Sequence, residues 1–240
     1  MIIYGINPVL EALRAKRVTR LSISARHDKR IDEMLALAAA QHVAAERVEA
    51  QILDRAARGG VHQGVVAEVE DARDYGVREL VDGNHANAPL IVVLDGIEDP
   101  HNVGAILRTA DAAGATGVVR QARHSAALDG VVGKASAGAL AYARIATVVN
   151  IARALEELKE AEVWTVGLAG EATEPYTDVD WTLPTAIVLG AEGTGLRRLI
   201  RERCDRLVTI PMHGSVGSLN VSVAAGVVLY EAVRQRAGRS

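Results

Sequence analysis

Residues 210–220, with the sequence IPMHGSVGSLN, join three kinds of local structure. The apolar run LVTI is typical of a strand and stops at Pro211, a loop with glycines follows, and residues 218–220 open a long apolar-periodic stretch. A strand that passes through a loop into a helix leaves free backbone N–H groups at the carboxyl edge of a sheet, where open α/β sheets bind ligands. The stretch therefore predicts a pocket in an α/β domain.

Length and composition favour a soluble globular protein. The chain has 240 residues, of which 49% are hydrophobic and 24% are charged, and these could form one large domain or two small ones. It has neither an apolar run of the ~18 residues that cross a bilayer nor the start of a signal peptide, so we expect a cytoplasmic protein without membrane contact. The lone Cys204 is interpreted as a small core residue.

Charge and aromatic content limit how RNA could be bound. The formal net charge is −3, so local basic clusters would have to attract a nucleic acid. Aromatic residues make up 3% of the chain and phenylalanine is absent, which argues against a platform on which bases stack.

The first 70 residues predict a compact α/β domain. Asn7-Pro8 is a cap followed by proline at the first helical position, so a helix is expected to begin there. The expected helices cover residues 8–16, 28–42 and 51–59, and the expected strands cover 18–25, 47–50 and 62–70. Residues 71–88 carry Asp, Gly and Asn and predict a linker with a helical turn in its middle.

Residues 89–240 alternate strictly between strand and helix patterns. The expected strands are 90–95, 116–120, 143–149, 163–169, 185–190 and 206–210. The expected helices are 102–114, 134–140, 150–162, 195–204 and a final helix that ends near Arg236. Continuous Val/Ile-rich strands between helices indicate a parallel sheet that is covered on both faces, and hence a second, larger α/β domain.

Polar residues follow the first strand of this domain, in residues 94–115. Asn102 stands just before the expected helix, and a helix N-cap is the favoured interpretation of this residue by itself. Arg108, a little under two turns further on, could point along the helix toward the same sheet edge. An isolated arginine at such a position is more often solvated.

Two further strand ends carry polar residues. The loop in residues 187–198, IVLGAEGTGLRR, lacks the dinucleotide spacing G-x-G-x-x-G, and Glu192 in its middle could accept hydrogen bonds or stabilise a cation. Ser218 and Asn220 are explained as well by helix capping as by a site, and both interpretations stay open. His124 and His213 have no spacing that suggests a metal site, so none is expected. Basic residues that are most often solvated helix faces, but that could also face phosphates, are Lys134, Arg197, Arg198, Arg201 and Arg203.

The conjunction of three segments decides between these interpretations. The stretches DPHNVGAILRTADAAG, LGAEGTGL and IPM followed by SLNVSVAA resemble, in order and spacing, the three motifs of the SpoU family of RNA 2′-O-ribose methyltransferases. The N-terminal stretches YGINPVLEAL and HQGVVA resemble the L30e-like RNA-binding domain of the branch that methylates a guanosine ribose in 23S ribosomal RNA.

This resemblance implies a fold, a cofactor and a site. The fold would be a SPOUT α/β domain (residues 89–240) whose C-terminal segment threads a trefoil knot, which chains rarely do. S-adenosylmethionine would bind in the knot, and the protein would work as a homodimer with residues of both subunits at the site. The catalytic residues implied are Asn102, Arg108, Glu192, Ser218 and Asn220. The cofactor-binding residues implied are Leu189, Gly190, Ala191, Glu192, Gly193, Ile210, Pro211, Met212, Ser218, Leu219 and Asn220.

The chemistry leaves the proton acceptor open. Methyl transfer to a ribose requires alignment of the 2′-hydroxyl with the methyl group and removal of the hydroxyl proton. Guanidinium is effectively always protonated, so we expect Arg108 to bind phosphate and stabilise the developing alkoxide. Water, phosphate or Glu192 would then take the proton.

Other functions remain to be weighed. The same chemistry on transfer RNA, or on the ribosomal site of thiostrepton resistance, is one alternative, and a non-catalytic RNA-binding assembly factor is another. The joint presence of Asn102, Arg108, Glu192 and Asn220 argues against the assembly factor, and the missing G-x-G-x-x-G argues against a nucleotide-dependent oxidoreductase. The target nucleotide is not encoded in any motif, because RNA is recognised largely by shape.

Overall fold

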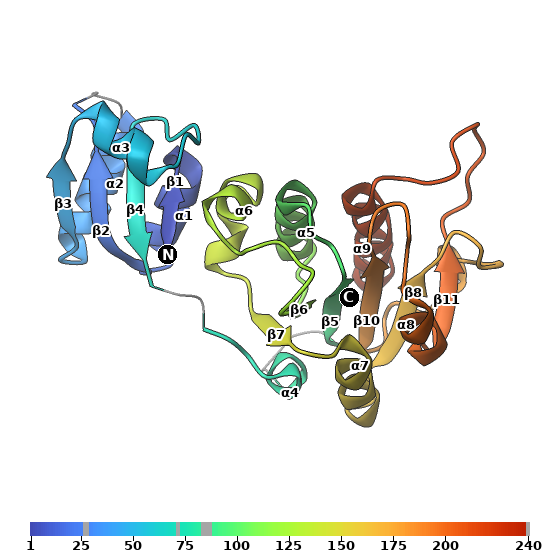
Figure 1. The fold of residues 1–240 in the computed structure, drawn as a ribbon. Coiled ribbons are helices and arrows are strands. Elements are labelled where there is room, and N and C mark those ends of the chain that lie inside the picture. Colours follow the sequence, from blue (N-terminus) through green and yellow to red (C-terminus); the bar gives the residue numbers. More distant parts are fainter. Residues whose placement is uncertain (26–28, 71–72, 83–87, 239–240) are drawn as a thin grey trace. The chain divides into compact units, whose positions relative to one another are not determined.

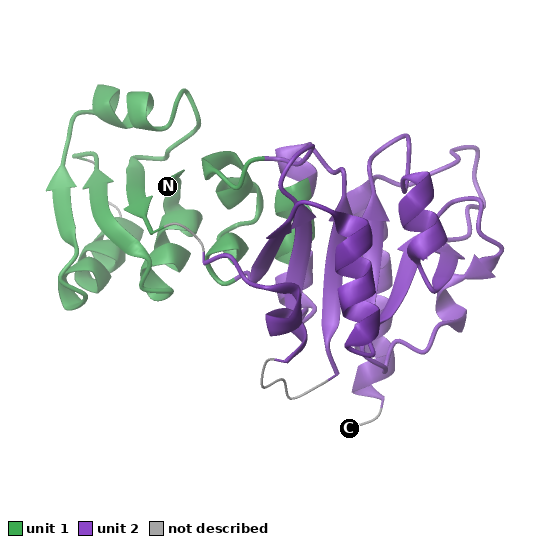
Figure 2. Ribbon diagram, turned by 60° about the horizontal axis from the view of Figure 1, so that its bottom comes forward, with its two compact units in different colours: residues 1–72, 103–108, 127–142 green, residues 73–102, 109–126, 143–240 purple. Residues whose placement is uncertain are grey.

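The computed structural model describes residues 1–25, 29–70, 73–82 and 88–238, and the chain forms two compact units (Figure 2). The first comprises residues 1–72, 103–108 and 127–142, and the second comprises 73–102, 109–126 and 143–240. Within the described ranges, no helix is long and apolar enough to cross a membrane.

The first unit contains a four-stranded sheet in the order β1-β4-β2-β3. Strands β1 (Ile2–Tyr4) and β2 (Val18–Ile23) run antiparallel to β4 (Val65–Val69), and β3 (Ala44–Arg47) runs parallel to β2. The helices are α1 (Ile6–Arg14), α2 (Lys29–Ala40) and α3 (Ala50–Ala56). The buried faces of α1, α2 and the sheet form one apolar core.

Two strands of this unit differ from the sequence expectation. β1 was not predicted, because three residues are too few to show an alternating pattern. The strand expected at residues 47–50 lies at Ala44–Arg47 instead, and Ala50 already begins α3. Every residue of β3 is exposed, so no apolar alternation marks its position.

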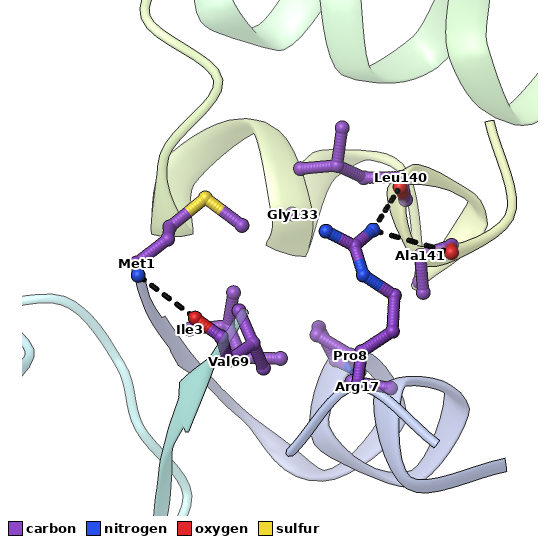
Figure 3. A pocket seen from close by; sticks show the side chains of 10 residues that line it. Met1, Ile3, Pro8, Arg17, Val69, Gly133, Leu140 and Ala141 are labelled. Atoms are coloured by element: carbon purple, nitrogen blue, oxygen red, sulfur yellow. Dashed lines mark hydrogen bonds between the residues drawn. The ribbon is translucent and has the colours of Figure 1, made fainter. Parts of the chain in front are cut away.

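A segment from later in the chain completes the first unit. It contains α6 (Gly130–Ala135) and the short 3₁₀ helix η1 (Ala139–Ala141), so the single helix expected at residues 134–140 is wrong. Gly138 between them has φ of +100°, which ends a right-handed helix and which glycine tolerates best. Arg17 donates to the main-chain carbonyls of Leu140 and Ala141 at 3.4 and 3.3 Å (Figure 3).

The second unit is built on a seven-stranded sheet in which all pairings are parallel (Figure 1). The order is β7-β6-β5-β10-β8-β11-β9. This confirms the parallel α/β fold expected from the Val/Ile-rich runs, and every residue of the central strands β5 and β10 is buried. The strands are β5 (Leu90–Asp95), β6 (Gly117–Gln121), β7 (Ile145–Val148), β8 (Trp164–Leu168), β9 (Glu174–Pro175), β10 (Thr185–Gly190) and β11 (Arg206–Thr209).

Helices cover both faces of this sheet. One face buries α4 (Val77–Val81), α7 (Ile151–Glu160) and α8 (Arg198–Arg203) in a common core, and α9 (Val221–Ala237) packs on the other side of β10 (Figure 1). The helix α5 (Pro100–Ala112) follows β5. The turn expected within residues 71–88 is α4, and its Leu80 is fully buried, so part of this stretch belongs to the second core. β9 and the 3₁₀ helix η2 (Tyr176–Asp178) were not predicted.

Candidate active site

The carboxyl ends of β8, β10 and β11 enclose a pocket of about 420 Å³ together with the start of α9. Neighbouring parallel strands end at the same edge of a sheet, so the loops that follow them meet there. The volume lies within the range of small-molecule sites. The described residues that line it lie in segments 168–171, 189–195, 208–212, 217–221 and at Ala224.

Most of the predicted cofactor-binding residues line this pocket. The residues that do are Leu189, Gly190, Ala191, Glu192, Gly193, Ile210, Met212, Ser218, Leu219 and Asn220. Pro211 is not one of the lining residues. Sequence reasoning missed residues 168–171, which are the last residue of β8 and the three that follow it. The sequence did contain a signal for these residues, because a strand was expected to end at Ala169. It did not indicate that β8 lies next to β10 and β11.

A close backbone approach shapes the loop that follows β10. A Cβ atom at Gly190 would lie 2.1 Å from the carbonyl carbon of Gly195 and 2.3 Å from the amide nitrogen of Leu196, so only glycine fits. Gly195 also donates from its amide to the carbonyl of Ala191 at 2.8 Å. These contacts fold residues 191–195 into a tight loop whose backbone faces the pocket.

Three polar side chains form a hydrogen-bonded chain at the pocket. The amide nitrogen Nδ2 of Asn102 donates to Oε2 of Glu192 at 3.1 Å, and Nδ2 of Asn220 donates to Oδ1 of Asn102 at 2.9 Å. Asn102 is buried, whereas Glu192 and Asn220 are exposed. The structure thus brings together residues that are far apart in the sequence, and their amide and carboxylate groups fix each other's orientation.

The capping roles differ from the favoured interpretations. The N-cap of α5 is Asp99, whose Oδ1 accepts from the His101 amide at 2.9 Å. Asn102 is therefore not a cap, and its side chain takes part in the hydrogen-bonded chain with Glu192 and Asn220, which we call the relay. Asn220 caps α9, accepting at Oδ1 from the Ser222 amide at 2.9 Å while its nitrogen donates to Asn102. Ser218 is exposed at the pocket and does not cap α9.

Arg108 is the predicted catalytic residue that stands apart. It is exposed on α5, a little under two turns beyond Asn102, and it is not among the residues that line the pocket. The pocket as formed by one chain therefore does not include this guanidinium.

The arginines after the glycine loop are not simply solvated. Arg197 binds Asp95, whose side chain is fully buried, with its Nε donating to Oδ1 at 2.7 Å. Arg198 pairs with Glu202, Arg201 with Glu171, and Arg203 with Glu156. For Arg197 the expectation of a solvated helix face is wrong, because this residue is the N-cap of α8 and its side chain turns back onto β5.

The charge of the pocket is negative. Glu171 and Glu192 are the ionisable residues that line it in the part of the chain that the structure describes. Glu171 is paired with Arg201, so a positively charged ligand would be attracted mainly by Glu192. Among the same described residues, no group of three His, Cys, Asp or Glu side chains could hold a metal ion. Burial raises the pKa of the Cys204 thiol to about 12, which suits the core role expected for it.

A second cavity lies within the first unit. It measures about 20 Å³ and is lined by Met1, Ile3, Val69 and Leu140 among other residues (Figure 3). This volume holds about one water molecule, so the cavity is too small for a cofactor.

Comparison with known proteins identifies the family. Residues 89–230 match the model of the SpoU rRNA Methylase family, and residues 2–75 match the model described as RNA 2'-O ribose methyltransferase substrate binding. The chain belongs to the SpoU rRNA methylase family.

Individual relatives span the whole chain. The chain is 48% identical over 240 residues to the 23S rRNA (guanosine-2'-O-)-methyltransferase RlmB of Pseudomonas putida, covering 98% of this chain and 96% of the relative. It is 44% identical to the protein of the same name from Haemophilus influenzae, covering 98% and 97%. Among solved structures, the SpoU methyltransferase AviRb from Streptomyces viridochromogenes in complex with AdoMet has a TM-score of 0.84 at 28% identity, covering 99% of this chain and 91% of that one.

Proposed function

We propose that this protein transfers a methyl group from S-adenosylmethionine to the ribose 2′-oxygen of a guanosine in 23S ribosomal RNA. The hydrogen-bonded chain from Glu192 through Asn102 to Asn220 carries the proposal, because it joins one residue from each of the three motifs, and Glu192 and Asn220 line the pocket while the buried Asn102 connects them. The names of the full-length relatives from Pseudomonas putida and Haemophilus influenzae support the choice of RNA.

The chemistry of the pocket fits the cofactor. Leu189, Ile210, Met212 and Leu219 provide apolar surface suited to an adenine ring, and the glycine loop lets a ligand approach the backbone closely. The negative charge of the lining suits a sulfonium cation. When bound, S-adenosylmethionine would supply an electrophilic methyl group. AdoMet is bound in the related methyltransferases from Streptomyces viridochromogenes and Sinorhizobium meliloti.

The chain's own residues would orient the reaction and manage its charge. Asn102 holds the Glu192 carboxylate at the pocket, and Asn220 holds Asn102 from the N-terminus of α9. Alignment of the 2′-hydroxyl with the methyl group accounts for much of the rate in such a displacement. Glu192 is a candidate acceptor for the hydroxyl proton, with water and the RNA phosphate as the other candidates.

Arg108 would act from a second subunit. Because it is exposed and does not line the pocket of its own chain, a homodimer in which each chain supplies Arg108 to its partner's pocket accounts for its position. The guanidinium stays protonated and would stabilise the alkoxide and bind the target phosphate. We further propose that the segment after β11 is threaded as a trefoil knot and that the protein works in the cytoplasm, where ribosomal RNA is processed.

One experiment tests the function. The protein is incubated with labelled S-adenosylmethionine and total RNA from a strain that lacks the gene, and the methylated riboses are mapped. We expect label at a guanosine of 23S ribosomal RNA. Label in transfer RNA would refute the choice of substrate, and bound cofactor without any label would favour the non-catalytic assembly factor.

The role of Arg108 has its own test. A pH–rate profile of Arg108→Lys should keep the shape of the parent profile at lower activity, because a cation stabilises the alkoxide in both proteins. Guanidinium and ammonium differ in geometry, which explains the expected loss of activity. A new ionisation near the pKa of lysine would instead identify residue 108 as the base.

A further inference from the structure

A buried ion pair joins the end of β5, which leads to Asn102, to the end of the glycine loop that carries Glu192. Asp95 is the last residue of β5, and its side chain is fully buried. Its Oδ2 accepts from the backbone amide of Arg197 at 3.0 Å, and its Oδ1 accepts from Nε of Arg197 at 2.7 Å. Arg197 therefore donates hydrogen bonds to both oxygens of a carboxylate that is shielded from water. Such hydrogen bonds offset the free-energy cost of removing the two charges from water.

The pair closes the glycine loop onto a neighbouring strand. β10 and β5 are adjacent, and Gly190 lies opposite Asp95 in their register. The chain leaves β10 at Gly190 and returns at Arg197 to the end of β5. Arg197 also donates from Nη2 to Oε1 of Gln121 at 2.9 Å, so its side chain spans the ends of β5 and β6.

The hydrogen bond from the Gly195 amide to the Ala191 carbonyl restrains the loop, but its glycines permit other backbone conformations. Gly193 and Gly195 have φ of +79° and +67°, and glycine populates such angles freely. Residues 191–195 are exposed or half-buried, so packing alone does not fix them. Yet Glu192 in this loop must meet Asn102 at 3.1 Å for the relay to form. The position of Glu192 depends on what holds the two ends of the loop, and Arg197 holds one of them.

We propose that Arg197 is a positioning residue. By binding Asp95 it fixes the end of the glycine loop, so that Glu192 faces Asn102 and the backbone of residues 189–195 lines the pocket. Arg197 is not itself among the lining residues. The proposal rests on the proposed function in one respect, namely that the pocket holds S-adenosylmethionine.

Two variants separate positioning from charge neutralisation. Arg197→Met leaves the buried Asp95 carboxylate without its partner, so its unfolding temperature should fall by several degrees. Asp95→Asn combined with Arg197→Met removes both charges and should recover most of that loss. If Arg197 positions the loop, the double variant should still bind S-adenosylmethionine roughly tenfold or more weakly than the parent. Removing both charges eliminates the unpaired carboxylate, but it does not restore the contact that orders the loop before the cofactor binds.

Arg198→Met is the matched control. Arg198 is the next residue, is 92% exposed in its side chain and pairs with Glu202 within α8. Its removal should leave the dissociation constant for S-adenosylmethionine at the parent value. Arg197→Lys, which keeps the charge but lacks the Nε donor, guards against a double variant that fails to fold, and it should also bind the cofactor more weakly than the parent.

Hydrogen exchange gives a readout that needs no cofactor. Amides of residues 190–196 should exchange faster in the double variant and in Arg197→Lys than in the parent, whereas the α9 amides should not change. Parental affinity together with parental exchange in these variants would overturn the positioning role. If the parent itself fails to bind S-adenosylmethionine, the proposed function is wrong, and the exchange of residues 190–196 still decides the role of Arg197.

Discussion

Replacing Gly190 by alanine tests the contact on which the pocket is built. The new Cβ would lie 2.1 Å from the Gly195 carbonyl carbon and 2.3 Å from the Leu196 nitrogen, whereas ordinary contacts begin at 3.4 Å. The two segments of main chain must therefore separate by about 1 Å, because backbone cannot rotate away as a side chain does. The φ angle of Gly190 is not positive, so alanine fits the strand itself and steric overlap is the whole effect.

The size of the effect follows from this displacement. Overpacking of this kind costs about 1 to 3 kcal/mol in the free energy of unfolding. For a chain of this size each kcal/mol lowers the unfolding temperature by roughly 2 to 4 °C. A shift of about 1 Å in the loop that carries Glu192 should also lower kcat/KM by roughly 100-fold. A 100-fold loss of kcat/KM corresponds to about 2.7 kcal/mol, so Gly190→Ala should lose activity and stability by similar free energies.

Calorimetry of unfolding and of cofactor binding provides the assay, and Gly214→Ala provides the control. Gly214 belongs to the loop before α9 and has no positive φ, and a Cβ atom added to it would meet no other atom within 4 Å. Alanine there should therefore leave both measurements at parent values. Parental unfolding temperature and parental affinity in Gly190→Ala would refute the close approach of residues 190 and 195, and with it the geometry derived for the pocket.

Three further changes probe the relay, the pH dependence and the thiol. Asn102→Ala should lower kcat/KM by roughly 100-fold and the free energy of unfolding by about 0.5 to 1.5 kcal/mol, as measured by kinetics and denaturant unfolding, because the hydrogen bonds of Asn102 to the exposed Glu192 and Asn220 are lost. The pKa of Asp205 is lowered although burial opposes this, because Lys159 and Thr165 donate to it. The ionised Asp205 therefore stabilises the fold at pH values above its pKa in the unfolded chain, and this stabilisation is lost as the pH falls through its pKa in the folded protein. Asp205→Asn should have a lower free energy of unfolding than the parent at pH 7, and the difference between the two proteins should narrow in acid. Cys204 should resist alkylation at pH 8 until the protein unfolds, since burial raises its pKa to about 12; rapid labelling of the native protein would contradict this.

The sequence was sufficient for six of the seven strands of the second sheet, all except β9. The central strands β5 and β10 are almost wholly apolar, so LIVVLD and TAIVLG are typical of buried parallel strands, and the loops after them were expected to meet at one edge. The exposed β3 and the three-residue β1 carry no such pattern, and they were misplaced and missed. The roles of the individual site residues stay predictions.

Local patterns could not separate a cap from a site residue. Asn102 and Asn220 both stand at helix starts, where asparagine is common. The difference lies in a contact between residues 118 positions apart, the hydrogen bond from Asn220 to Asn102. Asp95 shows the same limit, because its burial and its pairing with Arg197 depend on β10 lying beside β5.

The strand order explains why the relay forms where it does. After β5 the chain proceeds to β6 and β7 on one side of the sheet, whereas after β10 it proceeds to β11, beyond β8 on the other side. The connections therefore diverge between β5 and β10, and open α/β sheets place their sites at such a switch point. Asn102 follows β5 and Glu192 follows β10, so the two residues meet there. Asn220 reaches Asn102 because α9 begins at this same edge, so the site includes the N-cap residue of the last helix and is incomplete without it.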